Sequence, residues 1–204
     1  MPDFFNIFNE SYQIQLDLDS ALIIYPKKFE KESDLWINKL KSQCQWEQKH
    51  IIMFGKKVLE PRLVCWYGDE ECSYTYSKTI HRPLAWNSIL TQIREEIFEL
   101  TKIEMNSVLC NWYRNGQDSM GHHSDNEKEL GDLPEIISLS LGASRTILFK
   151  NKTTKKLIRI ELQNGDLLVM RGKTQDNWTH AIPKRTGCKE ERINLTFRKI
   201  IQAS

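Results

Sequence analysis

The sequence has no long hydrophobic run, and none of its apolar stretches approaches the ~20 residues that a membrane-spanning helix needs. Residues 1–20 contain no basic segment followed by an apolar one, so we expect no secretory signal there. Repeats, low-complexity segments and linkers are also lacking. A chain of 204 residues without such divisions is expected to form one domain with a substantial core, as a monomer and without a membrane partner.

The cysteines lack the spacing of a disulfide framework or of a zinc ribbon. They are odd in number and contain no Cys-x-x-Cys pair: Cys44, Cys65, Cys72, Cys110 and Cys188. This usage indicates a reducing compartment, so we expect a cytoplasmic protein, or a nuclear one if the source is eukaryotic.

An excess of charge of one sign is lacking as well. The 29 lysines and arginines nearly balance the 27 aspartates and glutamates, which gives a formal net charge of +2. This charge is too small to indicate nucleic-acid binding by itself, so any basic surface has to be local. A hydrophobic content of 40% and a charged content of 27% are ordinary for a globular protein.

Two stretches in the first half of the chain have helical spacing. Ser33 can cap the first helix. Its apolar face would be formed by Leu35, Trp36 and Leu40. The second helix is predicted over 83–101, with Pro83 in its first turn. Its apolar face would be formed by Leu84, Ile89, Ile93, Ile97 and Leu100.

Short apolar runs bounded by glycine and proline indicate strands. Residues 1–20 indicate a loose polar arm, and three strands are then expected over 21–25, 46–54 and 62–67. Further strands follow from Asn106 onward, over 108–113, 136–141, 145–149, 157–162, 167–170, 178–182 and 192–200. Many short strands with regular turn signals are typical of sandwiches and barrels. We therefore predict an α+β fold that is mainly β, with helices in front of a jelly roll.

A histidine and an aspartate stand two positions apart in His123-Ser124-Asp125. Side chains alternate along a strand, so on a strand these two would point to the same face. Two such ligands are two thirds of a 2-His-1-carboxylate site, which holds non-haem Fe(II) with open positions for O2 and a co-substrate. The motif is short enough to occur by chance. His122 would face the other way, so we expect it to be a surface or supporting group.

The third ligand would have to be His180, since no other histidine follows the motif. A lone histidine at a strand end is more often a structural residue satisfied by hydrogen bonds. A rolled sheet can nevertheless bring His180 next to the distant motif, which favours the metal site when the rest of the chain is considered.

The C-terminal strand alternates polar and apolar residues. Its polar face carries Arg192, Asn194, Thr196 and Arg198. Such a face can simply meet water. If it lines the interior instead, the two arginines need anionic partners, which a dicarboxylate would supply. Upstream, Asn111 and Tyr113 also share a face and can hydrogen-bond a carboxylate, although both are equally typical of routine polar positions.

The order Asn-x-Tyr, His-x-Asp, a late His and Arg-x-Asn-x-Thr-x-Arg resembles the AlkB family of Fe(II)/2-oxoglutarate-dependent nucleic-acid dealkylases. The second and third vertebrate homologues are the most similar. The stretches that carry the resemblance are Pro61-Arg62, Trp66-Tyr67-Gly68, YTYS (74–77), LCNWYRNGQDSMGHHSDNEKEL (109–130), ISLSLGASRT (137–146) and RINLTFR (192–198). Residues 1–45 match weakly.

The resemblance implies a double-stranded β-helix, or jelly roll, with N-terminal helices and a nucleotide-recognition lid. Residues 1–204 would form a single dioxygenase domain, divided into an N-terminal extension (1–45), a lid (46–82), a supporting helix (83–105) and the jelly-roll core (106–204). Fe(II) would be bound by His123, Asp125 and His180. The co-substrate 2-oxoglutarate would be bound by Asn111, Tyr113, Arg192, Asn194 and Arg198, with Arg192 at its distal carboxylate.

The resemblance also implies substrate contacts by Phe54, Arg62, Tyr67, Tyr74, Tyr76 and Glu127. Aromatic rings stack on a flipped base, and a carboxylate accepts from an exocyclic amine. The tyrosine pair is equally typical of a plain aromatic strand. Met53-Phe54-Gly55-Lys56 resembles a hairpin that inserts an apolar side chain into a duplex, although Phe54 suits a core position as well. Asn126 stands where the two similar homologues carry an acidic residue, which leaves the substrate preference open.

The implied reaction is demethylation of 1-methyladenine and 3-methylcytosine in DNA, with RNA as a further substrate, in the repair of alkylation damage. It would use Fe(II), O2 and 2-oxoglutarate and release formaldehyde, succinate and CO2. Phosphates would be contacted by residues such as Lys56, Lys57, Arg62 and Arg82. Two alternatives stay open: a 2-oxoglutarate oxygenase that hydroxylates a protein or small molecule, and a non-enzymatic jelly-roll binding module.

Overall fold

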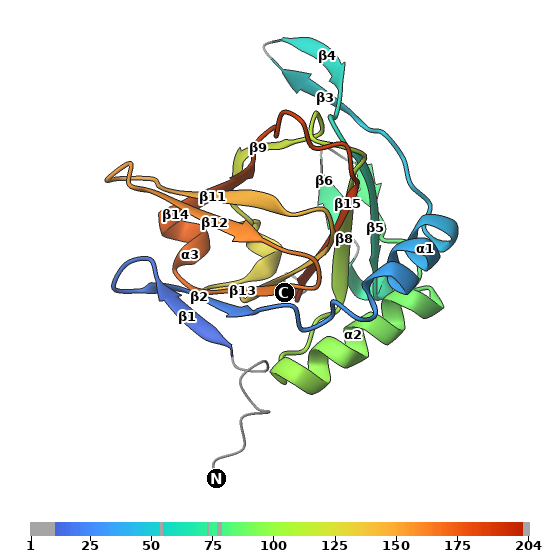
Figure 1. Ribbon diagram of the computed structural model, residues 1–204, viewed down its shortest axis with the longest axis horizontal. Helices are drawn as coiled ribbons and strands as arrows, with labels where there is room; N and C mark the ends of the chain where they lie inside the picture. Colours follow the sequence, from blue (N-terminus) through green and yellow to red (C-terminus); the bar gives the residue numbers. More distant parts are fainter. Residues whose placement is uncertain (1–10, 54, 73, 77–78, 202–204) are drawn as a thin grey trace.

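Two antiparallel sheets face each other in the computed structural model, which describes residues 11–53, 55–72, 74–76 and 79–201 (Figure 1). The larger sheet has the strand order β1-β2-β13-β10-β15-β8-β5, and the smaller has the order β12-β11-β14-β9. Their strands are β1 (Tyr12–Gln15), β2 (Ser20–Tyr25), β5 (Leu63–Gly68), β8 (Ser107–Tyr113), β9 (Met120–His123), β10 (Ile136–Gly142), β11 (Arg145–Asn151), β12 (Leu157–Leu162), β13 (Leu167–Gly172), β14 (Trp178–Ile182) and β15 (Arg192–Arg198). This is the predicted double-stranded β-helix.

Side chains of β15 point alternately to the outer and the inner face of the larger sheet, and the inner ones face the space between the two sheets. Ile193, Leu195 and Phe197 are fully buried on the outer face of the larger sheet, against the helices. Asn194 and Thr196 line a cavity on the inner face, between the two sheets. The parity predicted for this strand is confirmed, although the strand ends at Arg198 rather than at residue 200.

Two helices cover the outer face of the larger sheet: α1 (Ser33–Gln43) and α2 (Ser88–Thr101) (Figure 1). In α1, Trp36 and Leu40 are buried as expected, but Leu35 is 56% exposed. The residue preceding α1 is Glu32, which makes no side-chain cap, and the Ser33 hydroxyl donates instead to the side-chain oxygen of Asn164. The prediction that Ser33 caps this helix is therefore wrong.

The second helix begins five positions later than Pro83. Its N-cap is Asn87, whose side-chain oxygen accepts a hydrogen bond of 3.0 Å from the Leu90 N–H. Leu84 lies before the helix, where it forms an isolated bridge with Tyr67. An asparagine N-cap satisfies a free N–H of the first turn, which a proline cannot do, so the helix starts after Asn87.

The division of the chain into an extension, a lid and a core differs from the prediction in two places. Strand β2 pairs with β13, and β1 pairs with β2, so residues 12–25 belong to the larger sheet rather than to an extension. Strand β5 pairs with β8 and is likewise part of the core, although it falls within the range assigned to the lid.

Two small hairpins complete the fold. Strands β3 (His50–Met53) and β4 (Lys56–Leu59) form one hairpin, which projects from the body of the molecule (Figure 1). Gly55 lies in its turn with φ of 75°, a left-handed conformation that glycine adopts without strain. Strands β6 (Tyr74–Tyr76) and β7 (Thr79–His81) form the other. The short helices are η1 (Glu70–Cys72), η2 (Lys128–Leu130) and α3 (Thr174–Asn177).

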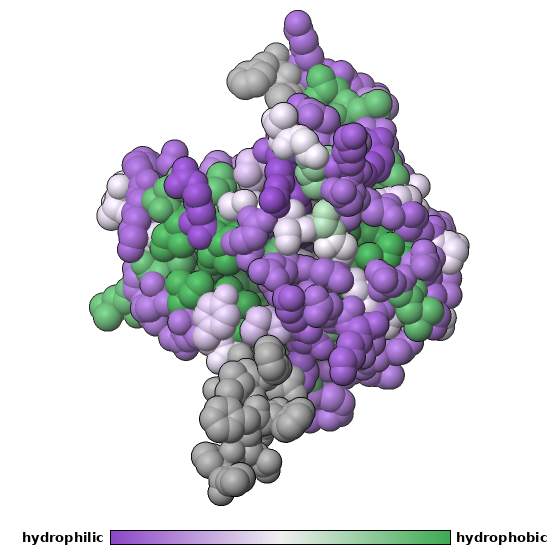
Figure 2. Space-filling model, in the orientation of Figure 1, coloured by the Kyte–Doolittle hydropathy of each residue, from purple (hydrophilic) through white to green (hydrophobic). Residues whose placement is uncertain are grey.

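Apolar residues gather over β11 to β14 on the face shown in the space-filling view, beside the interior between the two sheets (Figure 2). That interior is packed by large side chains that include Phe149, Met170 and Trp178. Among the described residues, no helix is both long and apolar enough to cross a membrane.

Candidate metal centre

The pairing of β9 with β14 brings two distant histidines together. His123 is the last residue of β9 and lies directly opposite His180 of β14. Their ring centroids are 4.2 Å apart. One ligand atom from each of them and one carboxylate oxygen of Asp125 all lie within 4.8 Å of one another. The structure thus assembles the three predicted metal ligands, and His122 is exposed beside them with its Nδ1 3.2 Å from the Thr179 hydroxyl.

Asp125 reaches the site from the loop after β9 rather than from the strand itself. The prediction of one strand carrying both ligands is therefore wrong, since β9 ends at His123. The Asp125 N–H donates to the side-chain oxygen of Gln175 in α3 at 3.0 Å, which holds this loop against the second sheet. Because Asp125 lies in a loop, its carboxylate can turn into the interior, and the residue is only 2% exposed.

The charges around Asp125 favour its ionised form. Burial acts to raise its pKa, but the charge of Arg198, followed by smaller electrostatic effects of His180 and His123, outweighs burial and lowers the pKa. Arg198 forms an ion pair with Oδ1 of Asp125. The other oxygen, Oδ2, is buried without a hydrogen-bond partner in the part of the chain that the structure describes. It lies 3.7 Å from Nε2 of His180, and an acceptor in this position suits a cation held between the three ligands.

Each imidazole is placed to present a ring nitrogen to a metal. Burial, and then the charge of His123, lower the pKa of His180 to about 3, so its ring is uncharged near neutral pH. Nδ1 of His123 lies 2.9 Å from the carbonyl oxygen of Gly121. A carbonyl can only accept, so Nδ1 carries the proton and Nε2 keeps a free lone pair for a metal.

Four of the five residues predicted to bind 2-oxoglutarate line the same cavity. All three metal ligands line it, together with Asn111, Tyr113, Asn194 and Arg198. Asn111 and Tyr113 of β8 pair in register with Asn194 and Arg192 of β15, so the four form one patch on the inner face of the sheet. Asn194 is fixed by bonds of 2.9 Å from Nδ2 to the Ser138 hydroxyl and to the Leu139 carbonyl oxygen.

Arg192 is a buried cation, and no ion pair joins it to an acidic side chain in the described part of the chain. It is 1% exposed, and its Nη2 donates to the Ser140 hydroxyl at 2.9 Å. Its Nε and Nη1 have no hydrogen-bond partner among the described residues. Burial lowers its pKa to about 10, and its guanidinium carbon lies 5.3 Å from the centroid of the Tyr113 ring. Donors left unpaired on a buried guanidinium are costly, and an anionic ligand such as a carboxylate would satisfy them.

The residues predicted to contact substrate are more scattered. Arg62 is 9% exposed and its Nε donates to Oδ1 of Asn111 at 2.9 Å, so it supports the cavity wall. Glu127 is exposed, two positions beyond Asp125. The backbone of Tyr74 and of Tyr76 lies in β6, and Phe54 lies outside the described residues.

Tyr67 does not face the cavity. It is 2% exposed on the outer side of β5, and its hydroxyl accepts a 2.9 Å bond from the Gln45 N–H. The contact between Tyr67 and a base, which the family resemblance implied, does not fit this position, because the side chain packs in the core under the helices. Its neighbour Trp66 points to the other side of β5, where its indole N–H donates to the Ser107 hydroxyl at 2.7 Å.

Several supporting residues were missed by sequence reasoning. Gln175 holds Asp125, and two serines of β10 fix Asn194 and Arg192. Arg145 is 1% exposed and donates to the carbonyl oxygens of Asp118 and Pro183 at 2.8 Å and 2.6 Å. It therefore links the segment before β9 to the end of β14, the two strands that carry the histidines. Arg145 falls in the stretch 137–146 that carries the family resemblance, and this resemblance was the one sequence signal that could have pointed to a role for Arg145.

Comparisons with known proteins agree with this geometry. The profile of the 2OG-Fe(II) oxygenase superfamily matches residues 21–198. Human alpha-ketoglutarate-dependent dioxygenase alkB homolog 3 is 38% identical over 192 residues, which cover 89% of this chain and 66% of that protein. Human DNA oxidative demethylase ALKBH2 is 36% identical over 159 residues, which cover 74% of this chain and 61% of that protein. The chain thus spans just under two thirds of the length of these relatives.

A more distant solved structure shows the same fold. The structure of OsALKBH1 superposes with a TM-score of 0.60 at 15% sequence identity. The match covers 92% of this chain and 100% of that chain. A double-stranded β-helix with two histidines and a carboxylate between its sheets defines a class, the mononuclear non-haem iron oxygenases.

Within that class, the chain belongs to the 2OG-Fe(II) oxygenase superfamily and, by its similarity to alkB homolog 3 and ALKBH2, to the AlkB family. The predicted family and fold class are confirmed. The superfamily uses Fe(II), 2-oxoglutarate and O2, and His123, Asp125 and His180 are the group that can hold the iron.

Proposed function

We propose that the protein is an oxidative demethylase that removes methyl groups from 1-methyladenine and 3-methylcytosine in DNA, and that RNA is a further substrate. The observation that carries the proposal is a 2-His-1-carboxylate cluster in a cavity whose wall includes Tyr113, the register partner of the buried Arg192 with its unpaired donors. The relatives named DNA oxidative demethylase and alpha-ketoglutarate-dependent dioxygenase support it.

The metal side of the reaction rests on three residues. His123 and His180 offer ring nitrogens and Asp125 a negative oxygen, so two positive charges of the ion are partly balanced. Fe(II) and 2-oxoglutarate, when bound, supply the O2-dependent oxidation of an N-methyl group, with succinate, CO2 and formaldehyde as products. Arg198 keeps Asp125 ionised, and Gln175 keeps it in place through the backbone.

The co-substrate side rests on the β8–β15 patch. We assign the distal carboxylate of 2-oxoglutarate to the unpaired donors of Arg192, which lies opposite Tyr113 in the register of β15 with β8. Tyr113 supplies a hydroxyl and Asn111 an amide along the same wall. Burial of these groups excludes water, which strengthens each charged hydrogen bond.

The nucleic-acid side rests on the β3–β4 hairpin and on Glu127. Lys56 and Lys57 are exposed on β4 and suit contact with phosphates. Phe54 lies outside the described residues but follows Met53 of β3 in the sequence, and we assign it to the gap that a flipped base leaves. Glu127, exposed beside the metal loop, would accept from the exocyclic amine of that base. Cationic methylated bases pair poorly, so they cost less to flip.

The test is an assay of formaldehyde release with Fe(II), 2-oxoglutarate and O2. The substrates are oligonucleotides that carry one 1-methyladenine or one 3-methylcytosine, as single- and double-stranded DNA and as RNA, beside the same unmethylated strands. We expect formaldehyde from methylated strands only. Activity that is equal on unmethylated strands, or absent on all methylated ones, would contradict the proposal.

The control is His180→Gln, which removes one iron ligand and should abolish formaldehyde release. If methylated strands give nothing while 2-oxoglutarate is still consumed with Fe(II), the alternative of a protein or small-molecule substrate gains support. If neither the iron nor 2-oxoglutarate binds, the protein is a binding module instead.

A further inference from the structure

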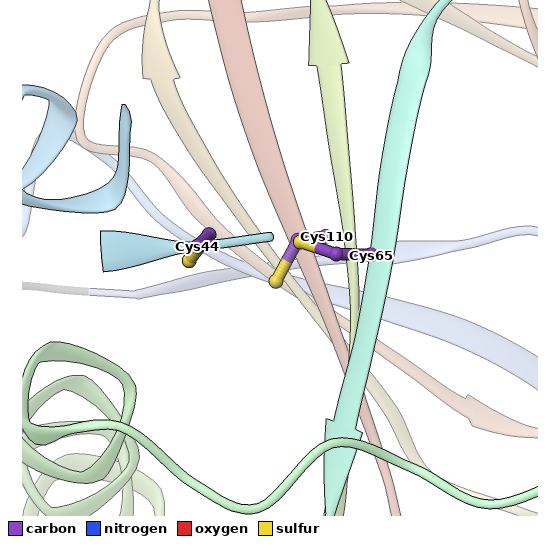
Figure 3. Close-up of side chains that lie close together, drawn as sticks. All are labelled: Cys44, Cys65 and Cys110. Carbon is purple, nitrogen blue, oxygen red and sulfur yellow. The ribbon is translucent and has the colours of Figure 1, made fainter. Parts of the chain in front are cut away.

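Three thiols from separate elements converge on the outer side of the larger sheet. Cys44 is the C-cap residue of α1, Cys65 lies in β5 and Cys110 in β8. Cys65 and Cys110 are direct partners in the β5–β8 register. All three are buried, and their sulfur atoms lie within 4.8 Å of one another (Figure 3).

The spacing suits a single metal ion. With a metal–sulfur distance of about 2.3 Å, three ligands in a plane have their sulfurs about 4.0 Å apart, and three corners of a tetrahedron have theirs about 3.8 Å apart. The sulfur atoms lie up to 4.8 Å apart, and small side-chain movements would shorten these distances to the values that a metal ion requires. The cluster contains no histidine and no carboxylate, so its donors are entirely soft.

The surroundings of Cys44 supply hydrogen-bond donors to its sulfur. Nδ2 of Asn87 lies 3.6 Å from the Cys44 sulfur, and Asn87 is the N-cap of α2, a helix of 14 residues. The neighbouring Tyr67 hydroxyl also acts to lower the pKa of the Cys44 thiol. Donors and the positive end of a helix stabilise a thiolate, the form that binds metals. Cys72, by contrast, is a buried thiol that donates to the Asn106 carbonyl oxygen at 3.3 Å.

We propose that Cys44, Cys65 and Cys110 bind one Cu(I) ion. Cu(I) is soft and accepts three sulfur ligands, whereas zinc in structural sites takes four ligands, and the cluster offers three. On binding, the ion displaces the thiol protons of the three ligating cysteines, and those protons pass to the solvent.

The site is reachable and is distinct from the iron site. Cys65 lines a surface cavity of about 430 Å³ together with Trp46 and Trp66, so an ion can approach it from outside. Cys110 points to the helix side of β8, whereas its neighbour Asn111 faces the cavity of the metal centre. The proposal does not depend on the demethylase activity.

The test is anaerobic titration of the reduced protein with Cu(I) supplied as its bicinchoninate complex, in the presence of a divalent-metal chelator. We expect transfer of one equivalent of Cu(I) to the protein. X-ray absorption at the copper edge should then show only sulfur neighbours, at about 2.3 Å. No transfer, or nitrogen neighbours from histidines, would overturn the proposal.

Variants add a second line of evidence. Cys44→Ala and Cys65→Ala should each weaken Cu(I) binding by at least about 100-fold. Loss of a residue that only hydrogen-bonds a metal ligand already lowers metal affinity by about 10- to 100-fold, and these variants remove a ligand itself. The matched control Cys72→Ala removes a buried thiol outside the cluster and should bind Cu(I) as the natural chain does. His123→Ala should also keep the site. Unchanged affinity in the two cluster variants would contradict the proposal, and the absorption experiment on the natural chain decides it if the variants do not fold.

Discussion

His180 makes the stability of the protein depend on pH. Its pKa falls from 6.5 to about 3 on folding, first through burial and then through the charge of His123. Between these values the unfolded chain binds a proton that the folded protein does not, so the free energy of unfolding decreases as the pH falls. The pKa of Asp125 is also lowered on folding, but its effect begins only near the ordinary pKa of a carboxyl group, about 3.9.

We therefore expect urea unfolding, in the presence of a chelator, to show falling stability from about pH 6.5 to 4.5. His180→Gln should flatten this dependence by up to about 1.4 kcal/mol per pH unit, the effect of one titrating group. A variant slope equal to that of the natural chain would show that His180 is protonated within the fold.

Arg192 should control the affinity for 2-oxoglutarate. Its unpaired donors are buried, so a carboxylate bound there forms charge-assisted hydrogen bonds worth about 1.5 to 3 kcal/mol. Arg192→Met is expected to raise the Kd for 2-oxoglutarate by about 10- to 100-fold, measured by calorimetry with Mn(II) in place of iron. Arg159→Met, which removes an exposed arginine of β12, is the matched control and should leave the Kd unchanged. Equal effects of the two variants would exclude Arg192 from the co-substrate site.

The start of α2 depends on one side chain. Asn87 accepts from the Leu90 N–H at 3.0 Å and donates to the Gln43 carbonyl oxygen at 3.2 Å, so it also joins α2 to the end of α1. Asn87→Ala should lower the free energy of unfolding by about 1 kcal/mol, and Asn87→Asp should keep the cap. Urea unfolding at neutral pH measures both, with Ser88→Ala as the neighbouring control. An effect of Ser88→Ala as large as that of Asn87→Ala would assign the cap to the wrong residue.

The β3–β4 hairpin should carry phosphate contacts as a unit. Lys56 and Lys57 are both exposed on it. Replacing both by glutamine removes two positive charges and should reduce the slope of log affinity against log salt by about 1.8 on duplex DNA. Filter binding across a salt series measures the slope. The control pair Lys155→Gln and Lys156→Gln, exposed beyond β11, should leave it unchanged, and equal slopes for both double variants would remove the hairpin from the interface.

The elements with strong local patterns could be predicted from the sequence, and those defined by pairing could not. Strand β14 was predicted with its observed bounds, and the alternation along β15 was correct because seven residues show one period. Strand β1 was missed, since its polar residues have no apolar pattern and it forms only by pairing with β2. Tyr67 was misassigned because the face that it occupies follows from the register of β5 with β8.

At the scale of the whole molecule, the metal ligands were predictable because few histidines exist to choose from, and their order along the chain restricts the choice further. What fixes their geometry was not predictable. Gln175 lies 50 residues from Asp125, and Arg145 joins carbonyl groups on two segments that meet only after the sheets have rolled. Contacts of this kind leave no local pattern, because they depend on the closed fold.

The metal centre should therefore also act as a cross-link of that fold. It joins β9, the following loop and β14, and no unfolded chain holds these three ligands together. A divalent ion at 100 times its Kd should add about 2.7 kcal/mol to the stability. For a chain of this length that corresponds to a rise in Tm of about 5 to 11 °C. Differential scanning fluorimetry with Mn(II), which resembles Fe(II) but resists oxidation, measures the shift, and addition of excess chelator should reverse it. His180→Gln should show little or no rise, because one strand then loses its ligand. A rise of the same size in that variant would mean that the ion binds elsewhere.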